Sequence, residues 1–504
     1  MMRGFLALPV TLMLTACMVG PDYHRPDAPV PSAYKELKGW TIAQPQDTAD
    51  RGPWWSIYHD PELDRLEREL DVSNQTIKQF EAQYRNAIAL VQEARANLFP
   101  VASVAADVTH SSGFGGGGGS RGSSNSFSGS TATTGITSPT TSAGTGAISS
   151  SGGGAPRTQY SVQGSIDWDL DVWGRIRRQV ESQVAFAQVN AADLANARLS
   201  AQVTLATDYF DLRAEDSLAE LLRQTVAAFQ RSLQITQNQH AAGTVSSADV
   251  VTAQAQLEGA RAQLIGVGVQ RAIFEHAIAV LTGHPPADLT IPPAPLASAV
   301  PVAPPGLPST LLERRPDIAA AERQMQQENE LIGVQVAAFY PDITLSALLG
   351  FVGSPLSQLF TVPNRVWSLG AAANETLFEG GARSAAVAAA RATYDQSVAN
   401  YRQVVLTAFQ QVEDEIASLR ILAQQARAEA IAVAAAQHAL EVTLNEYRAG
   451  TIVYTSVITQ QTTLLADQQT LLAVQQNRLV ASVALVGALG GGWNAAQIAG
   501  AGRP

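Results

Sequence analysis

Two very long stretches of this chain contain neither glycine nor proline, the residues that most often interrupt a helix. One lies between Gly174 and Gly243, and the other lies between Gly381 and Gly450. At 1.5 Å per residue, each stretch could form a helix of about 100 Å. Charged side chains interrupt both stretches, so neither suits the interior of a bilayer. The sequence therefore predicts two long helical rods that lie in water.

The two rods belong to a longer internal repeat. The pattern Asn-x-x-x-Ala-Gly-Thr begins at Asn238 and again at Asn445, and a shift of 207 residues aligns the two halves without a gap from Gly174 to Arg271. Upstream of Pro100 the matching shift is 241 residues. The 34 extra residues of the first half fall in a Gly/Ser/Thr tract at about 111–157, whose composition predicts a mobile surface loop.

The repeat gives the expected layout of the chain. We expect a signal peptide at 1–16, a lipid-anchored irregular segment at 17–61, a first repeat at 62–283, a proline-rich linker at 284–308, a second repeat at 309–490 and a tail at 491–504. Each repeat should hold a helix, two strands and a long helical hairpin. In the first repeat the helix is expected as a helical run at 62–98. The hairpins are expected at 175–283 and 382–490, and glycines favour the left-handed turns between their arms.

Four short segments predict strands. The clearest begins at Tyr160, where apolar and polar side chains alternate and the acids Asp167, Asp169 and Asp171 all fall on the polar side. The strands are expected at about 98–110, 158–172, 341–352 and 364–378. Any one of them alone could be the edge of a soluble sheet.

The number of strands constrains the assembly. If the apolar faces meet lipid, the sheet must close so that every backbone amide is paired, and known barrels begin near eight strands. Four strands per chain are too few, so several copies must share one barrel. Three copies would supply twelve strands, and the acids of the Tyr160 strand would face a water-filled lumen.

The N-terminus carries an export signal. Arg3 precedes an apolar run that is too short to span a bilayer and has the form of a signal peptide. Leu-Thr-Ala-Cys at 14–17 resembles a bacterial lipobox, which implies a covalent lipid on Cys17, the only cysteine. Met18 after it favours the outer membrane in similar lipoproteins. The alternative is an uncleaved anchor with an incidental cysteine.

Charge and composition exclude other classes of function. A net charge of −11 without a basic run gives no reason to expect nucleic acid as a partner. The seven histidines lack metal-ligand spacing and no Gly-x-Ser-x-Gly elbow is present, so neither a metal, a cofactor nor an enzyme is predicted. The five-glycine run lacks the Gly-Lys-Ser/Thr of a phosphate loop. Arg-Arg-Pro-Asp at 314–317 is interpreted as a helix start.

A series of short motifs occurs in the order of a known family. They are the lipobox, Val-Gly-Pro-Asp-Tyr at 19–23, Trp-Trp at 54–55, Phe-Pro at 99–100, Trp-Gly-Arg at 173–175, Leu-Leu-Glu-Arg-Arg-Pro-Asp-Ile-Ala-Ala-Ala-Glu at 311–322 and the two Ala-Gly-Thr turns. With the repeat, they make the chain resemble the outer membrane factor family, the TolC-like exit ducts of tripartite efflux pumps and type I secretion. Within it, the chain is most similar to the lipid-anchored, NodT-type branch.

The resemblance implies a mainly α-helical homotrimer with a membrane β-barrel. The barrel would have 12 strands, four per chain, and would continue into a long α-helical periplasmic tunnel with a closable tip. The implied partners are outer membrane lipid, a periplasmic adaptor and an inner-membrane resistance-nodulation-division pump. The chain would then be a passive exit duct for drugs or other small toxic compounds.

The resemblance also assigns roles at the hairpin tips. Asp249 falls where TolC-like channels place an acid that links neighbouring coils, and Tyr447 falls on a tyrosine of the same network. A helix cap explains Asp249 equally well. The mouth that docks the adaptor and closes the tunnel would be formed by the turns at Gly243, Thr244, Gly450 and Thr451.

The second tip departs from the family pattern. Ile452 stands where related channels often carry a basic residue, and Ser456 and Thr459 stand where they carry acids. An acidic ring is therefore not expected from this half, and the two tips should not contribute equally to closure.

Three alternative functions stay open on the sequence alone. The duct could serve type I secretion. A periplasmic adaptor also has helical hairpins, but normally a single hairpin flanked by β-rich domains. A coiled-coil lipoprotein without a pore is the third alternative.

Overall fold

The structure is a computed structural model that describes residues 18–28, 30–31, 33–36, 53–111, 157–301 and 314–493. The predictions for the signal peptide, the lipid on Cys17, the Gly/Ser-rich tract and the tail beyond 493 therefore lie outside the described residues. Contacts divide the chain into a helical unit and a smaller unit, formed by 97–171 and 341–376, that holds a sheet.

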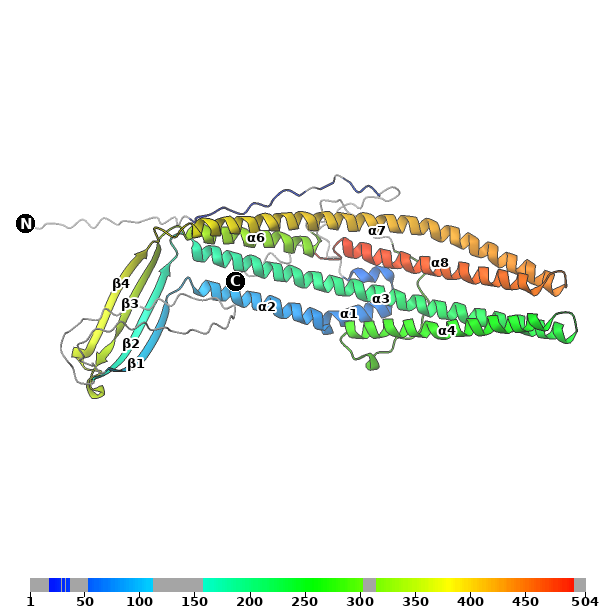
Figure 1. Cartoon of the computed structure of the whole chain (residues 1–504), viewed down its shortest axis with the longest axis horizontal. Coiled ribbons are helices and arrows are strands. Elements are labelled where there is room, and N and C mark those ends of the chain that lie inside the picture. Colours follow the sequence, from blue (N-terminus) through cyan, green and yellow to red (C-terminus); the bar gives the residue numbers. More distant parts are fainter. Residues whose placement is uncertain are drawn as a thin grey trace, which may run out of the picture. The chain divides into compact units, whose positions relative to one another are not determined.

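The helical unit is built from long helices (Figure 1). In chain order they are α1 (Pro61–Ser73), α2 (Gln75–Ala96), α3 (Arg175–Ala241), α4 (Ser247–Leu281), α6 (Pro316–Ala337), α7 (Ala382–Arg448) and α8 (Tyr454–Ala488). The pairs α3/α4 and α7/α8 form two antiparallel hairpins whose tips lie at the same end of this unit (Figure 1).

The two hairpins have matching dimensions. Both α3 and α7 contain 67 residues, and both α4 and α8 contain 35. The starts of α7 and α8 are displaced from those of α3 and α4 by the same shift that aligns the two halves of the sequence. Similarly, α6 has 22 residues like α2, and the displacement between their starts is the larger shift found upstream of Pro100.

The helical run expected at 62–98 is two helices, because Asn74 interrupts it. The Asn74 backbone is extended, with ψ at 126°. Its side-chain oxygen accepts a hydrogen bond from the Ile77 amide at 3.0 Å, and its side-chain nitrogen donates to the Leu281 carbonyl at 2.7 Å. Asparagine competes with helical hydrogen bonds in this way, so the expectation of one uninterrupted helix was wrong.

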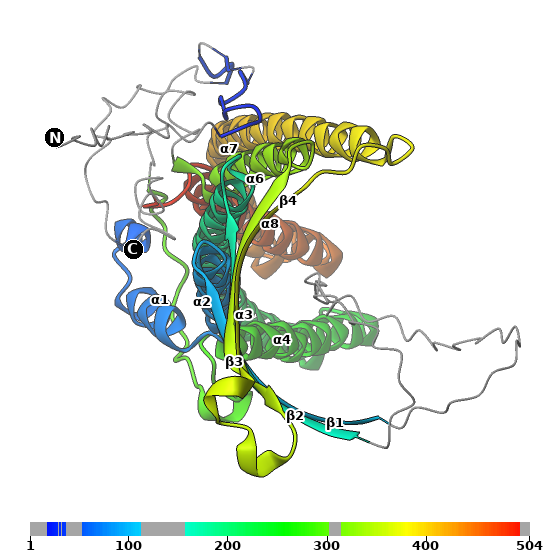
Figure 2. The ribbon, with the colours of Figure 1, turned by 90° about the vertical axis from the view of Figure 1, so that its left-hand side faces the viewer.

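Buried apolar side chains hold the helices together. One cluster joins α1, α3, α4 and α8 around residues such as Leu66, Tyr209 and Phe210, and a second joins α6, α7 and α8 around Tyr401 and Val405. Figure 2 gives a nearly end-on view of these helices, and α6 packs against both α3 and α7. The repeats therefore share their cores.

The sheet unit is a four-stranded antiparallel sheet in the order β1-β2-β3-β4. Its strands are β1 (Val101–Ser111), β2 (Arg157–Leu170), β3 (Asp342–Gly353) and β4 (Arg365–Asn374).

Two strands end earlier than the alternation predicts. β2 ends at Leu170, so Asp171 lies outside the strand. Continued pairing would set Asp171 opposite Asp342, and like charges directly opposite each other destabilise a sheet. β4 ends at Asn374, not near 378, because its partner Asp342 is the first residue of β3.

Candidate functional site

The sheet has one apolar and one polar face. Directly paired residues lie on the same face, and the register gathers apolar side chains of all four strands. They are Val104, Val108, Ile166, Trp168, Leu345, Leu349, Trp367 and Leu369. Val104 and Leu369 are 79% and 78% exposed, so this face lacks a partner within the chain's described residues.

Polar side chains occupy the opposite face. The Ser103 and Ser165 hydroxyls are hydrogen bonded at 2.8 Å, and Asp167 pairs in register with Ser346. Asp167 and Asp169 are exposed on this face, as the alternation predicts. Asp171 lies beyond the end of β2 and is half-buried.

The first hairpin tip is closed by backbone and capping hydrogen bonds. Gly243 has a φ of 76°, and the Thr244 amide and hydroxyl both donate to the Gln239 carbonyl, at 3.0 and 2.9 Å. Ser246 caps α4, and Asp249 completes a capping box by accepting from the Ser246 amide at 3.1 Å and its hydroxyl at 2.9 Å. The structure thus gives Asp249 the helix-cap role.

The second tip repeats the turn but not the cap. Gly450 has a φ of 74°, and the Thr451 hydroxyl donates to the Glu446 carbonyl at 2.9 Å. Val453 occupies the N-cap position of α8 without a side-chain cap.

The three substituted positions of this tip have different surroundings. Ile452 is partly buried in the apolar cluster of the tip, Ser456 is half-buried, and Thr459 is exposed. The Thr459 hydroxyl donates to the Thr455 carbonyl at 3.0 Å. These positions therefore hold apolar and hydroxyl side chains in place of charged ones.

An aromatic cluster compensates for the missing cap. Tyr447 and Tyr454 are both 3% exposed, with ring centroids 5.3 Å apart. The Tyr447 hydroxyl lies 3.4 Å from the Thr236 hydroxyl on α3, and the Gln461 side chain donates to Ser232 at 2.8 Å. The second tip is therefore fastened to the long helix of the first hairpin.

The electrostatics link Asp249 and Tyr447, the two residues that the family resemblance makes candidates for the periplasmic gate. Burial raises the pKa of Tyr447, and the carboxylate of Asp249 raises it further, whereas Thr236 lowers it. Burial, with Tyr447 next, raises the pKa of Tyr454 to about 12. Both tyrosines are neutral at physiological pH, and the structure brings Asp249 and Tyr447 to the same end of the hairpins.

The sequence interpretation missed Tyr454, Thr236 and the Gln461–Ser232 contact. In the alignment of the two repeats, Tyr454 matches Ser247. This difference between the copies is the one sequence signal that could have pointed to Tyr454.

The segment that follows the predicted lipid site docks near the start of α3. The Val19 amide donates to the Trp173 carbonyl at 3.1 Å, and Asp22 forms an ion pair with Arg178 at 3.1 Å. A Cβ on Gly174 would come within 2.8 Å of the Met18 side chain, so this position requires glycine both for its φ of 83° and for the close approach.

Arg178 also forms the most buried ion pair of the region. Its guanidinium contacts Glu330 on α6 at 2.6 Å, with 3% and 5% of the two side chains exposed. Burial and the neighbouring Glu330 raise the pKa of Glu181 to about 7. This cluster joins the N-terminal segment to α3 and α6.

The described residues also bear on metal binding and on membrane-spanning helices. Within the described ranges, no three His, Cys, Asp or Glu side chains gather closely enough to hold a metal ion. Two helices, α4 and α8, are long and apolar enough to cross a membrane by length and composition. Both are the short arms of hairpins whose long arms carry charges along their length.

The chain is similar to known efflux proteins along nearly its whole length. A family model described as outer membrane efflux protein matches residues 68–284 and 307–491. The probable efflux pump outer membrane protein TtgC of Pseudomonas putida is 29% identical over 507 residues, covering 98% of this chain and 96% of that protein. The probable outer membrane lipoprotein SilC of Salmonella typhimurium is 26% identical, covering 97% and 98%.

Solved structures agree with this match. The outer-membrane channel OprN superposes with a TM-score of 0.82 at 26% identity, covering 95% of this chain and 100% of that one. The family model accounts for most of the chain, in two stretches that each contain a complete hairpin. The chain belongs to the outer membrane efflux protein family.

Proposed function

We propose that three copies of this chain form one exit duct in the outer membrane, through which drugs or other small toxic compounds leave the cell. Each copy contributes its two internal repeats: four strands to a 12-stranded barrel, and two hairpins to a helical tunnel. An inner-membrane resistance-nodulation-division pump, linked by a periplasmic adaptor, supplies the energy. The duct itself then needs no catalytic site.

The sheet carries this proposal. Its apolar face is exposed, and β1 and β4 each pair with a single neighbour, so among the described residues both edges of the sheet end in unpaired backbone groups. In lipid, each unpaired group costs several kcal/mol, and only a closed barrel removes them. Further copies can extend the sheet at both edges, and three copies reach a size that known barrels have. Asp167 and Asp169 would then face the lumen.

The hairpins supply the periplasmic part. Both tips lie at one end of the helical unit, where Gly243, Thr244, Gly450 and Thr451 would form the mouth that meets the adaptor (Figure 1). Tyr447 would help to close the tunnel, because its aromatic cluster already attaches the second tip to α3 of the first hairpin. Asp249 would contribute once its carboxylate leaves the capping box.

A lipid on Cys17 would hold the chain at the membrane. The support comes from Met18, the next residue, which packs against Gly174, four residues after the end of β2. The similar SilC is named a lipoprotein. A Cys17→Ala protein that still incorporates radioactive fatty acid would contradict this assignment.

The trimer is tested by gel electrophoresis of detergent-extracted protein. A shared barrel should migrate as a trimer without heating and as a monomer after heating. Leu369→Asp places a charge on the apolar face of β4 and should weaken or abolish the trimer, since a charged side chain that faces lipid destabilises a barrel by an amount that depends on its depth. Ser368→Asp, on the polar face of the same strand, is the matched control and should leave it intact.

Export is tested in a deletion strain across a panel of toxic compounds. The wild-type gene and the Ser368→Asp variant should restore resistance, and the Leu369→Asp variant should not. Unchanged susceptibility of the deletion strain to every compound would contradict the proposed efflux role.

A further inference from the structure

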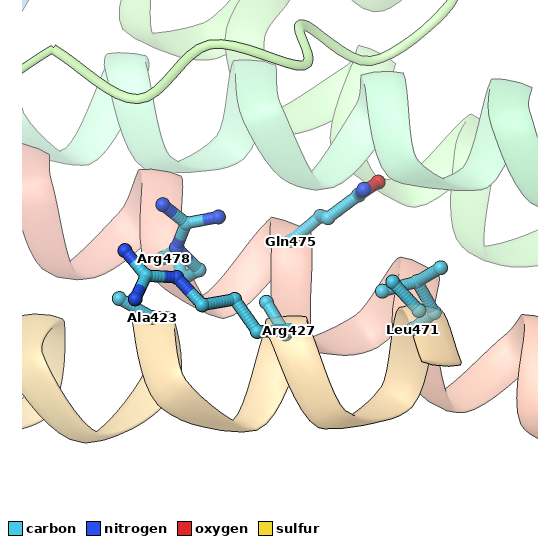
Figure 3. Close-up of a pocket in the computed structure, with 7 residues that line it drawn as sticks. Ala423, Arg427, Leu471, Gln475 and Arg478 are labelled. Atoms are coloured by element: carbon cyan, nitrogen blue, oxygen red, sulfur yellow. The ribbon is translucent and has the colours of Figure 1, made fainter. Parts of the chain in front are cut away.

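A pocket of about 250 Å³ lies between the two arms of the second hairpin. Alanines of α7 and Leu471 of α8 form its apolar wall, and Arg427 and Arg478 are its two charged residues. The Arg427 side chain extends along α7 toward Ala423, and Arg478 of α8 lines the same pocket (Figure 3).

The two arginines have no counter-charge in the described part of the chain. Neither guanidinium forms an ion pair with a described residue, and the Nε atom of Arg478 is buried without a hydrogen-bond partner. Arg427 is exposed, and Arg478 is half-buried. Two like charges that line one small pocket repel each other, and the buried Nε donor of Arg478 costs free energy while it lacks an acceptor. The arrangement calls for an anion.

The first hairpin shows what fills the equivalent position. Arg271, the counterpart of Arg478 in the repeat, donates from Nε to Asp216 at 2.7 Å and contacts Glu275 at 3.1 Å. Asp216 also forms an ion pair with Arg213 at 3.0 Å. Two carboxylates therefore balance this cluster from within the chain.

The second hairpin lacks those carboxylates. At the same shift, Ala423 replaces the first acid, Ser482 replaces the second, and Arg427 stands where the first hairpin has a glutamate. One further arginine of the second hairpin, Arg420, forms an ion pair with Glu36 of the N-terminal segment. The pocket arginines have no such partner among the described residues.

We propose that the Arg427–Arg478 pocket is a carboxylate-binding site, filled from outside the chain. Carboxylates satisfy the equivalent arginine in the first hairpin, and a guanidinium matches a carboxylate with two parallel hydrogen bonds. Ala423 stands where the first hairpin has Asp216, and its small side chain leaves room in the pocket for the entering carboxylate. The carboxylate comes either from an acidic side chain of a second copy, which rests on the proposed trimer, or from a small acid in solution.

The experiment compares full-length wild-type protein with the Arg427→Gln/Arg478→Gln variant. Thermal midpoints of trimer dissociation, from unheated gels, and of unfolding, from circular dichroism, are measured in acetate and in chloride at equal ionic strength. Arg261→Gln is the control, because this exposed arginine already has Glu258 as a partner at 2.7 Å.

The two sources give different results. If a second copy supplies the carboxylate, the double variant loses several degrees in its dissociation midpoint in both salts. If the carboxylate comes from solution, acetate raises the wild-type midpoint by a few degrees and has no effect on the double variant. Equal midpoints for wild type, double variant and control in both salts would overturn the proposal.

These outcomes are separable from those of the proposed function. A wild-type protein that never migrates as a trimer contradicts the proposed duct, yet its unfolding in acetate still reports on the pocket. A stable trimer with no dependence on Arg427 and Arg478 contradicts only the pocket.

Discussion

The two hairpins share a backbone but differ in what stabilises them. The first balances its charges internally, through Asp216, and caps its short helix with Ser246 and Asp249. The second has neither the Asp216 carboxylate nor a side-chain cap, and it relies on the buried Tyr447 and Tyr454 at its tip and on partners outside the hairpin.

The difference shows which features the architecture requires. The helix lengths and the glycine turns are the same in both copies, because they set the reach of the hairpins and the direction of the chain. Charge pairs and caps are local, so each copy can exchange them for other contacts of similar free energy. Substitutions in each hairpin test whether the two are stabilised as differently as this implies.

Asp216→Ala should have the largest effect. The Asp216 side chain is 4% exposed and accepts from two arginines and from the Ala294 amide. Its removal leaves Arg213 without a carboxylate and Arg271 with Glu275 alone, and breaking a buried ion pair in this way costs about 3–5 kcal/mol of unfolding free energy. Circular dichroism in detergent measures the loss.

Glu220→Ala is the control for that measurement. Glu220 forms an ion pair with Arg223 three residues along the same helix, but both side chains are about half exposed. Exposed pairs contribute at most about 1 kcal/mol. Equal losses for the two variants would show that the buried cluster does not distinguish the first hairpin.

Tyr447→Ala should loosen the second tip. A buried aromatic side chain replaced by alanine costs about 3 kcal/mol, and the contact with Thr236 on α3 disappears with it. Hydrogen exchange near 440–460 should accelerate strongly. His240→Ala changes the equivalent but exposed position of the first tip. It removes one side-chain hydrogen bond, to the Val245 carbonyl at 3.0 Å, so exchange there should accelerate much less.

A pair of acids on the long helices should give a smaller, pH-dependent effect. Burial, and then the charge of Asp211, raises the pKa of Asp208 to about 6, and burial with Asp414 raises that of Glu415, its counterpart in the second hairpin. The folded state holds these protons more tightly than the unfolded state. Below about pH 4, Asp208 is protonated in both states and does not lower the unfolding free energy. Between about pH 4 and 6 it ionises more readily in the unfolded state, so the unfolding free energy falls as the pH rises.

Neutral substitutions should remove that cost. Asp208→Asn should raise the unfolding free energy at pH 7.5 by about 1 kcal/mol, after a reduction for partial solvent exposure, and should flatten its fall between about pH 4 and 6. Glu415→Gln should act in the same direction. Thermal midpoints across this pH range measure both, and a loss of stability at pH 7.5 would contradict the assignment.

The sequence predicted what is periodic and missed what depends on tertiary contacts. The hairpins and the two faces of the sheet follow from helix and strand spacing, and glycine chemistry predicted the turns at Gly243 and Gly450. The break at Asn74 depends on a bond to Leu281, which lies far along the chain. Likewise, the partners of Tyr447 and the unpaired Arg478 emerge only when different helices meet.

Ser246→Ala and Asp249→Ala separate capping from gating at the first tip. Either variant breaks the capping box and should cost about 1 kcal/mol of local stability, seen as faster hydrogen exchange at the start of α4. Val453→Ser, which supplies the missing cap of α8, should slow exchange at the second tip by a similar amount.

If Asp249 also holds the gate closed, only Asp249→Ala should raise the single-channel conductance in planar bilayers, because Ser246→Ala keeps the carboxylate. Equal conductance in both variants would leave Asp249 as a helix cap, and the closure of the duct would then depend on the second tip.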